Sequence, residues 1–286
     1  MDVKKPTTYA QQLEILKKRG CVIENETWAL EVLKNINYYR LSAYFIPFKK
    51  DENTYFEGTT FENVYHIYEF DRKLRSLIFS MLEEIEILLR TRISYFFSHK
   101  YGALGYKDTD NFNLNHDNEK FNKHYSDMIE QNKTKAFVKH HIEEYGSQFP
   151  LWVLVELMSL GELSFFYSDM LIADRKAIAN DVFGTQEKNV CSWLACLTNL
   201  RNSCAHYSRL YNAVFPFRPR TPNGYGYTLQ KRVFDYLIVV KFMYLDADKW
   251  NNTYVTAIKQ LINEYDGYLD LNHLGFLDSW EDMLRK

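Results

Sequence analysis

The sequence has little glycine, proline or cysteine, and no long uncharged run. Its 286 residues include 11 glycines, 6 prolines and 4 cysteines. The longest stretch without Lys, Arg, Asp or Glu is Asn189–Leu200, twelve residues, shorter than the ~20 apolar residues of a membrane-spanning helix. No apolar segment follows Met1–Pro6, so we expect neither a signal peptide nor a membrane anchor. The protein is therefore expected to be cytoplasmic.

Motifs for metals and cofactors are also missing. The cysteines form no Cys-x-x-Cys pair, so neither a zinc site nor a disulfide framework is expected. His140 and His141 are adjacent, and neighbouring histidines on a helix point about 100° apart, which is unsuited to a shared metal. The sequence has no phosphate-binding loop, dinucleotide fingerprint or serine elbow, so we expect no metal and no cofactor.

Charge is nearly balanced and aromatic residues are abundant. The 35 Lys and Arg face 37 Asp and Glu, for a net charge of -2, which excludes a chain coated in positive charge but permits a local basic groove. Aromatic residues make up 16% of the chain. Many large side chains and few helix breakers favour long helices packed through aromatics.

One segment has a far stronger helical period than the rest. Residues 61–98 carry apolar side chains three and four apart, predicting a helix of about 50 Å. Glu69 with Lys73 and Glu86 with Arg90 stand four apart and are expected to pair along it. The apolar positions of this helix are Ile67, Phe70, Leu74, Leu77, Met81, Ile85, Leu88 and Phe96.

The remaining pattern is also helical, so we predict an all-α bundle. The polar segment 101–149 is expected to be an insertion with one or two short helices. The chain is divided into an N-terminal segment 1–50, a segment 51–149 with the long helix and the insertion, and a region 150–286. Further helices are predicted over 7–19, 27–37, 151–160, 162–172, 174–183, 187–211, 229–246 and 253–265.

A compact polar motif, Arg201-Asn202-Ser203-Cys204-Ala205-His206, lies within the predicted helix 187–211. On a continuous helix, Asn202, His206 and Arg209 lie within about 60° of one another. The opposite side is the expected buried stripe of Trp193, Leu197, Leu200, Cys204, Tyr207 and Tyr211. The polar face is either a solvated surface or a site that cleaves phosphodiesters, since His exchanges protons near neutral pH and Arg binds phosphate.

The motif resembles known families. Arg-Asn-x-x-x-His matches the signature of HEPN ribonucleases, and a similar motif occurs in RNA-guided CRISPR effectors with paired HEPN domains. The string LRNSCAHYSRLYN at 200–212 resembles the C-terminal signature of the bacterial Abi family, abortive-infection proteins of the AbiD and AbiF type. Segments 16–48 and 68–98 resemble that family's opening segment and long charged helix. The tail LGFLDSWEDML is a weaker match, and 101–149 matches least.

This resemblance implies an antiphage or toxin endoribonuclease that needs no metal, with a HEPN-like C-terminal half. His206 would be the general acid or base, a role worth about 10²–10⁴-fold in rate. Arg201 would stabilise the phosphorane, and Asn202 would orient the imidazole or hold the scissile phosphate. RNA is the implied substrate, and a small noncoding RNA or a protein antitoxin is the implied restraining partner.

A single motif lacks a second acid–base group. HEPN proteins supply it by pairing two motifs, usually across a dimer, so a homodimer is expected. Two other readings stay open: a non-catalytic RNA-binding or scaffold protein of an abortive-infection system, and a helical interaction protein with no RNA role.

Several residues outside the motif are candidate RNA contacts. Arg209 and the loop 215–227, which has no acidic residue, are the first choice, because phosphate attraction and base stacking can act together there. The loop candidates are Arg218, Arg220, Tyr225 and Tyr227. Two groups have a structural alternative, namely core packing for Tyr38, Tyr39, Arg40 and Tyr44, and intrahelical ion pairs for Arg72, Arg75, Arg90 and Arg92.

Overall fold

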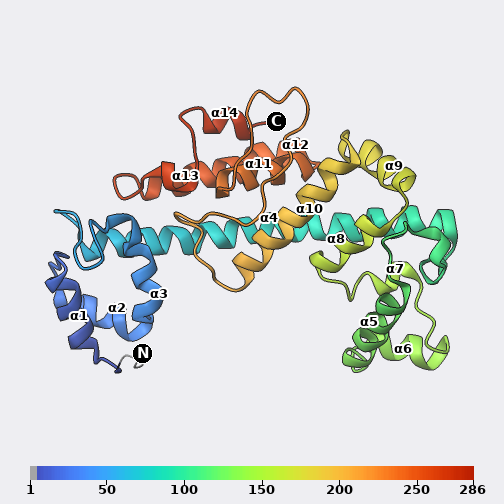
Figure 1. The fold of residues 1–286 in the computed structure, drawn as a ribbon, viewed down its shortest axis with the longest axis horizontal. Helices are drawn as coiled ribbons and strands as arrows, with labels where there is room; N and C mark the ends of the chain where they lie inside the picture. The colour runs from blue at the N-terminus through green and yellow to red at the C-terminus, as the bar shows by residue number, and fades with distance from the viewer. Residues whose placement is uncertain (1–4) are drawn as a thin grey trace.

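The computed structural model describes residues 5–286, and its helices pack along one very long helix, α4 (Figure 1). α4 spans Phe61–Tyr101, 41 residues, which corresponds to about 60 Å. Within residues 5–286 the only β-type pairing is three isolated bridges. The predicted all-α class and the predicted long helix are therefore confirmed.

Shorter helices precede and follow α4. The α-helices are α1 Tyr9–Lys18, α2 Glu26–Asn35, α3 Tyr38–Ser42, α5 Asn118–Gln131, α6 Ala136–Glu144, α7 Leu151–Leu154, α8 Leu160–Asp169, α9 Ile172–Phe183, α10 Glu187–Ala205, α11 Val233–Met243, α12 Ala247–Lys249, α13 Thr256–Glu264 and α14 Trp280–Leu284. The 3-10 segments are η1 Ala43–Phe48, η2 Gly105–Lys107, η3 Thr109–Asn111 and η5 Leu271–Leu274, and η4 Trp250–Val255 is a π-helical turn.

Local sequence explains where α4 begins and ends. The Thr60 side chain accepts a hydrogen bond from the backbone N–H of Asn63, which caps the first turn. Gly102 follows the last turn with φ 82°, a conformation that glycine adopts at little cost. Glu86 pairs with Arg90 at 2.6 Å as predicted, but Lys73 pairs with Glu264 of α13 instead of Glu69.

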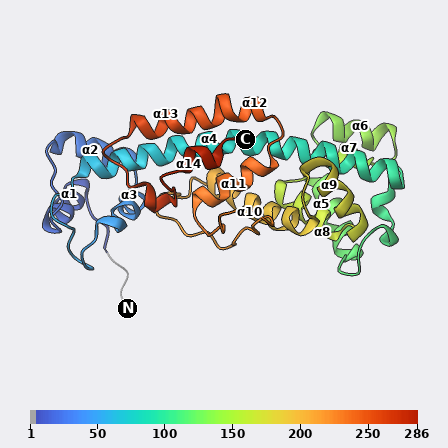
Figure 2. The same ribbon diagram turned by 90° about the horizontal axis from the view of Figure 1, so that it is seen from above.

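The other helices pack against α4 in three places, namely along its middle and near each of its two ends. α1–α3 lie at one end and α5–α7 at the other (Figure 1). Figure 2 shows α13 on one side of α4 and α10 on the other, and both contact α4. The helix α10, which carries the Arg201–His206 motif, therefore crosses the central part of the long helix.

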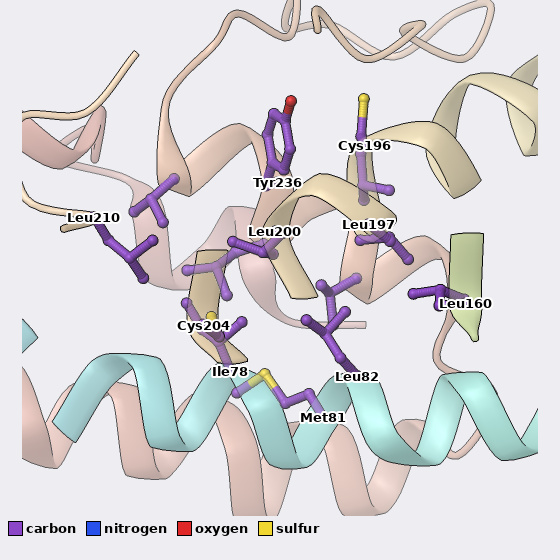
Figure 3. Packing of buried hydrophobic residues seen from close by; sticks show 14 of the residues in the cluster. Ile78, Met81, Leu82, Leu160, Cys196, Leu197, Leu200, Cys204, Leu210 and Tyr236 are labelled. Carbon is purple, nitrogen blue, oxygen red and sulfur yellow. The ribbon is translucent and has the colours of Figure 1, made fainter. Parts of the chain in front are cut away.

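Buried side chains fill the contact between α10 and α4. Figure 3 shows side chains of α10 facing those of α4, with Leu160 of α8 at one side of this contact and Tyr236 of α11 beside Cys196 on the face of α10 away from α4. α11 is apolar on all faces, as expected for a helix at the centre of a core, and nine of its eleven residues are buried. The buried residues at the crossing are Ile78, Met81 and Leu82 from α4 and Leu197, Leu200 and Cys204 from α10.

Most other predicted helices are confirmed within a few residues, and the insertion holds two helices, α5 and α6. Two boundaries are wrong. The helix predicted over 151–160 ends at Leu154, and the helix predicted over 187–211 ends at Ala205. The second difference changes the geometry of the candidate site. Across residues 5–286, no helix has the length and apolar character required to cross a membrane.

Thiol reactivity offers a direct check of the core. All four cysteines are free, and burial raises the pKa of Cys21 to about 12, of Cys196 to about 11 and of Cys204 to about 12. Because the thiolate is the reactive form, only the half-buried Cys191 should react quickly. We expect about one thiol per folded chain in an Ellman titration and four after unfolding. A Cys191→Ser variant should lose the fast reaction, and rapid labelling of Cys204 would contradict the packing.

Candidate functional site

The motif helix α10 ends in a turn that normally requires glycine. The N–H of Tyr207 bonds to the Cys204 carbonyl at 3.2 Å, and the N–H of Ser208 bonds to the Ser203 carbonyl at 2.8 Å. This pair of bonds is the Schellman pattern, in which the residue after the cap is left-handed and usually glycine. Here that residue is Tyr207, with φ 57°, which costs about 1–2 kcal/mol for a residue with a Cβ.

Contacts from distant segments hold this turn in place. Arg40 of α3 donates a hydrogen bond to the Tyr207 carbonyl at 2.6 Å, and Arg75 of α4 donates to the Ser208 carbonyl at 3.3 Å. The carboxylate of Asp71 accepts the backbone N–H groups of Leu210 and Tyr211 at 3.1 and 2.8 Å. Residues from α3 and α4 therefore fix the chain immediately after His206.

Asp71 is the centre of that anchor. It is fully buried and also pairs with Arg75 and accepts the Tyr44 hydroxyl at 2.6 Å. Burial raises the pKa of the Asp71 carboxyl, and Arg75 and the hydrogen bonds act in the opposite direction. Asp71 and Arg75 occupy apolar positions of the α4 period, between Ile67 and Ile78. Charged residues at apolar positions of a helix indicate a buried ion pair, and this signal could have identified Asp71 and Arg75 from the sequence.

The motif side chains differ in their surroundings. The Arg201 Nε lies 3.6 Å from an oxygen of Glu86, and its guanidinium carbon lies 5.8 Å from the ring centre of Phe79. Glu86 is buried and shares its carboxylate with Arg90. Arg201 is thus directed toward α4, a contact that the sequence analysis missed.

Asn202 and His206 are exposed at the end of α10. His206 is the C-cap residue, and its backbone N–H bonds to the Asn202 carbonyl at 2.9 Å. In residues 5–286 no hydrogen bond joins their side chains, so the two groups remain available for a ligand. The expected orientation of the imidazole by Asn202 is not formed here.

A cleft of about 740 Å³ opens beside the end of α10. Its walls come from the α2–α3 junction, from one face of α4 and from the last turn of α10, and they contain no Asp or Glu. Its lining residues are Asn35, Ile36, Asn37, Arg40, Tyr68, Arg72, Arg75, Ser76, Phe79, Cys204, Ala205 and Tyr207. The cleft is within the usual size range of ligand pockets, about 300–1,000 Å³.

The early end of α10 corrects two expectations that assumed a continuous helix. Tyr207 was expected in the buried stripe, but its side chain is 68% exposed. Arg209 was expected on the face of Asn202 and His206, but it lies beyond the helix and donates a hydrogen bond to the Ala43 carbonyl at 2.8 Å. Burial lowers the pKa of Arg209. Arg209 therefore links the segment after α10 to the segment after α3.

The structure does not bring the candidate loop 215–227 to the motif. Arg220 contacts Ser192 and Trp193 through its backbone, about 20 Å along α10 from His206. Tyr227 donates a hydrogen bond to the buried Asp235, and burial, followed by Asp235, raises its pKa to about 12.

The other loop candidates divide into packed and exposed groups. Tyr225 packs edge-on against Phe242, with ring centres 5.1 Å apart. Arg218 and Arg220 keep exposed side chains, although Arg218 also donates to the Leu229 carbonyl at 2.8 Å. The two tyrosines therefore have structural partners, and the two arginines remain the loop's candidates for contact with RNA.

The earlier arginines and tyrosines combine structural roles with a place at the cleft. Ion pairs form for three of the four α4 arginines, Arg72, Arg75 and Arg90, and within residues 5–286 Arg92 forms none. Arg72 and Arg75 nevertheless line the cleft. Tyr44 is core, whereas Tyr39 is 86% exposed and Arg40 lines the cleft.

Two alternative chemistries have little support at this site. In residues 5–286 no three His, Cys, Asp or Glu side chains are grouped to hold a metal ion. Cys204 is next to the cleft, but burial raises its pKa to about 12, so its thiol is not an activated nucleophile. The ionisable groups of the motif outside the core are the exposed His206 and the half-buried Arg201.

The fold and site define an all-α protein with a basic cleft at the end of a motif helix. The family described as "Abi-like protein" matches residues 31–212, more than half of the chain. The chain belongs to this family, which indicates a role in abortive infection. Neither a curated protein nor a solved structure gives a significant match.

Proposed function

We propose that the protein is a HEPN-type endoribonuclease of antiphage defence, acting as a toxin on RNA without a metal. One observation carries the proposal: His206 is exposed at the end of α10, on the same helix as Arg201, and its chain neighbours Ala205 and Tyr207 line a cleft whose lining has three arginines and no acidic residue. A neutral imidazole, a guanidinium and a basic groove are the groups that phosphodiester cleavage by an internal 2′-hydroxyl requires.

Each group has a defined task in this reaction. His206 removes the proton from the 2′-hydroxyl, whose oxygen then attacks the adjacent phosphorus. Arg201 neutralises the charge that develops on the phosphorane oxygens. Glu86 holds the Arg201 Nε at 3.6 Å, which leaves the terminal nitrogens of the guanidinium for phosphate. Asn202, one turn before His206, is placed to hold the scissile phosphate.

The test is cleavage of total RNA by the purified chain in EDTA, with His206→Ala protein as the blank. We expect wild-type cleavage to persist, because the proposed proton transfer and charge stabilisation use only protein groups. The products should carry 2′,3′-cyclic phosphate ends. Loss of activity in EDTA with recovery in Mg²⁺ or Mn²⁺ would contradict the mechanism.

A non-catalytic RNA-binding role is the second candidate. One observation favours it: a single chain presents one acid–base group at the cleft, and cleavage needs a second to protonate the leaving oxygen. If the purified protein binds RNA and never cleaves it, and His206→Ala only weakens binding, this alternative is preferred.

A second copy of the chain would supply the missing group, and we propose an isologous homodimer. The exposed apolar side chain nearest the motif is that of Phe79 on α4, which is 37% exposed and whose ring centre lies 5.8 Å from the Arg201 guanidinium carbon. A contact between two copies at Phe79 would bring the two motifs to one interface.

Mixing experiments test the composite site. If each cleft uses groups from both chains, adding His206→Ala chains to wild type should lower the activity per wild-type subunit. An excess of inactive chains should reduce that activity at least several-fold, measured at fixed wild-type concentration after subunit exchange. A monomer that is fully active at working concentration would disprove the composite site.

A further inference from the structure

Tyr207 combines an unfavourable backbone with an exposed aromatic ring. Its left-handed conformation, φ 57°, is one that a bulky residue adopts at a cost. Burial of the ring does not offset that cost, because 68% of the side chain is exposed. Glycine would make the same turn without strain. The ring is therefore better explained by a contact with a ligand than by the stability of the chain.

The ring stands at the cleft that opens beside the motif. Tyr207 lines it together with Phe79, which is 37% exposed. Aromatic faces in a positively charged groove are the common means by which proteins bind single-stranded nucleic acid. Tyr207 also follows His206 directly, so a base stacked on its ring would lie next to the phosphate at the imidazole.

Charge in the cleft is sufficient for one phosphate. Arg75 is neutralised by the buried Asp71, and Arg72 pairs with Glu69. Arg40 is exposed, forms no ion pair within residues 5–286, and uses one nitrogen for the Tyr207 carbonyl. Its remaining N–H groups stay available, and Arg40 lines the same cleft as Tyr207.

We propose that this cleft binds one unpaired nucleotide of the RNA substrate, adjacent to the scissile phosphate, with its base stacked on Tyr207 and its phosphate on Arg40. The inference rests on the proposed ribonuclease function and adds a subsite to it. The cleft volume of about 740 Å³ accommodates a nucleotide. Asn35 and Asn37 also line the cleft. Asn35 Nδ2 donates to the Glu31 carbonyl and Asn37 Oδ1 accepts the Tyr39 N–H, so the Asn35 Oδ1 and the Asn37 Nδ2 are left for a base edge.

Binding of the four ribonucleoside 5′-monophosphates to the full-length His206→Ala chain tests the subsite without cleavage. Relative to this parent, an added Tyr207→Gly change should weaken binding roughly tenfold, the effect of one lost base–aromatic stack. The midpoint of thermal unfolding should not fall, since glycine fits the turn. Tyr207→Phe keeps the ring and should bind like the parent.

Two bulky substitutions on α4 provide a matched pair. Ser76→Phe fills the cleft from an exposed position, and Thr91→Phe adds the same side chain at an exposed position of α4 outside the cleft. We expect Ser76→Phe to abolish nucleotide binding and Thr91→Phe to leave it unchanged. Equal binding by Ser76→Phe, Tyr207→Gly and the parent would overturn the subsite, as would no binding by the parent at millimolar nucleotide.

Cleavage assays on the chains with His206 intact separate the two hypotheses. If RNA is never cut but Ser76→Phe abolishes nucleotide binding, the ribonuclease proposal fails and the binding cleft stands. If RNA is cut and neither variant changes nucleotide binding or the KM for RNA, the ribonuclease stands and the subsite fails.

Discussion

Replacing His206 by alanine is expected to lower the rate of RNA cleavage about 10²–10⁴-fold, the usual contribution of a positioned general acid or base. The side chain is exposed at the end of α10, so its loss should change the free energy of unfolding by no more than about 0.5 kcal/mol. Single-turnover cleavage of a labelled RNA and urea unfolding of the same preparations measure the two quantities.

An exposed histidine elsewhere on the molecule is the control for this substitution. His99 lies near the end of α4, and its ring contacts Tyr95 of the same helix. His99→Ala should cleave RNA at the wild-type rate. If His206→Ala retains wild-type activity, or if both variants lose activity equally, His206 is not the acid–base group.

Replacing Asp71 by asparagine is expected to destabilise the fold by about 3–5 kcal/mol, because it leaves the buried Arg75 guanidinium without a counter-charge. The same change weakens the hydrogen bonds to Leu210 and Tyr211. Cleavage should fall as well, since the turn after His206 loses its anchor. Urea unfolding gives the free energy, and limited proteolysis near 207–211 reports the release of the turn.

The pair of Glu69 and Arg72 on the same helix is the matched control for Asp71. Glu69 lies 2.9 Å from Arg72, whose side chain is about half exposed. Glu69→Gln should therefore cost less than about 1 kcal/mol. If Asp71→Asn costs no more than Glu69→Gln, the buried pair does not anchor the turn as we infer.

The long helix was predictable because its signals are local. Apolar residues at helical spacing place Ile67, Phe70 and Leu74 on one face, and all three are buried. The first helix was predictable for the same reason. Thr8 and Gln11 form the reciprocal capping bonds that their spacing predicts, and Gly20 takes the left-handed conformation after the helix.

The end of α10 was not predictable from local sequence. No glycine or proline occurs between Arg201 and Phe215, and the apolar spacing continues to Tyr211. The turn is imposed by contacts from Arg40 and Arg75, which are 167 and 133 residues away from their partners in the chain. Apolar periodicity does not reflect such distant contacts. It therefore predicted that the helix continues through Tyr207 and Arg209, whereas α10 ends at Ala205.

For the candidate site too, local features could be predicted from the sequence and long-range contacts could not. The Arg201–His206 motif was identified from its residues, but its surroundings were not. Ion pairs were the favoured interpretation of the α4 arginines, and the structure confirms them for Arg72, Arg75 and Arg90. The cleft wall around Arg40 depends on how α3 packs against α4, which residue spacing does not determine.

The anchor at Asp71 also determines when the site can form during synthesis of the chain. Its bonds to Leu210 and Tyr211 join residues that are 139 and 140 positions apart, so they can close only after nearly three quarters of the polypeptide has been made. Contacts of such long range form late in folding, because the intervening chain must first be ordered. A nascent chain that has folded α4 therefore still lacks the candidate site, which is complete only when the turn beyond His206 has left the ribosome and reached Asp71.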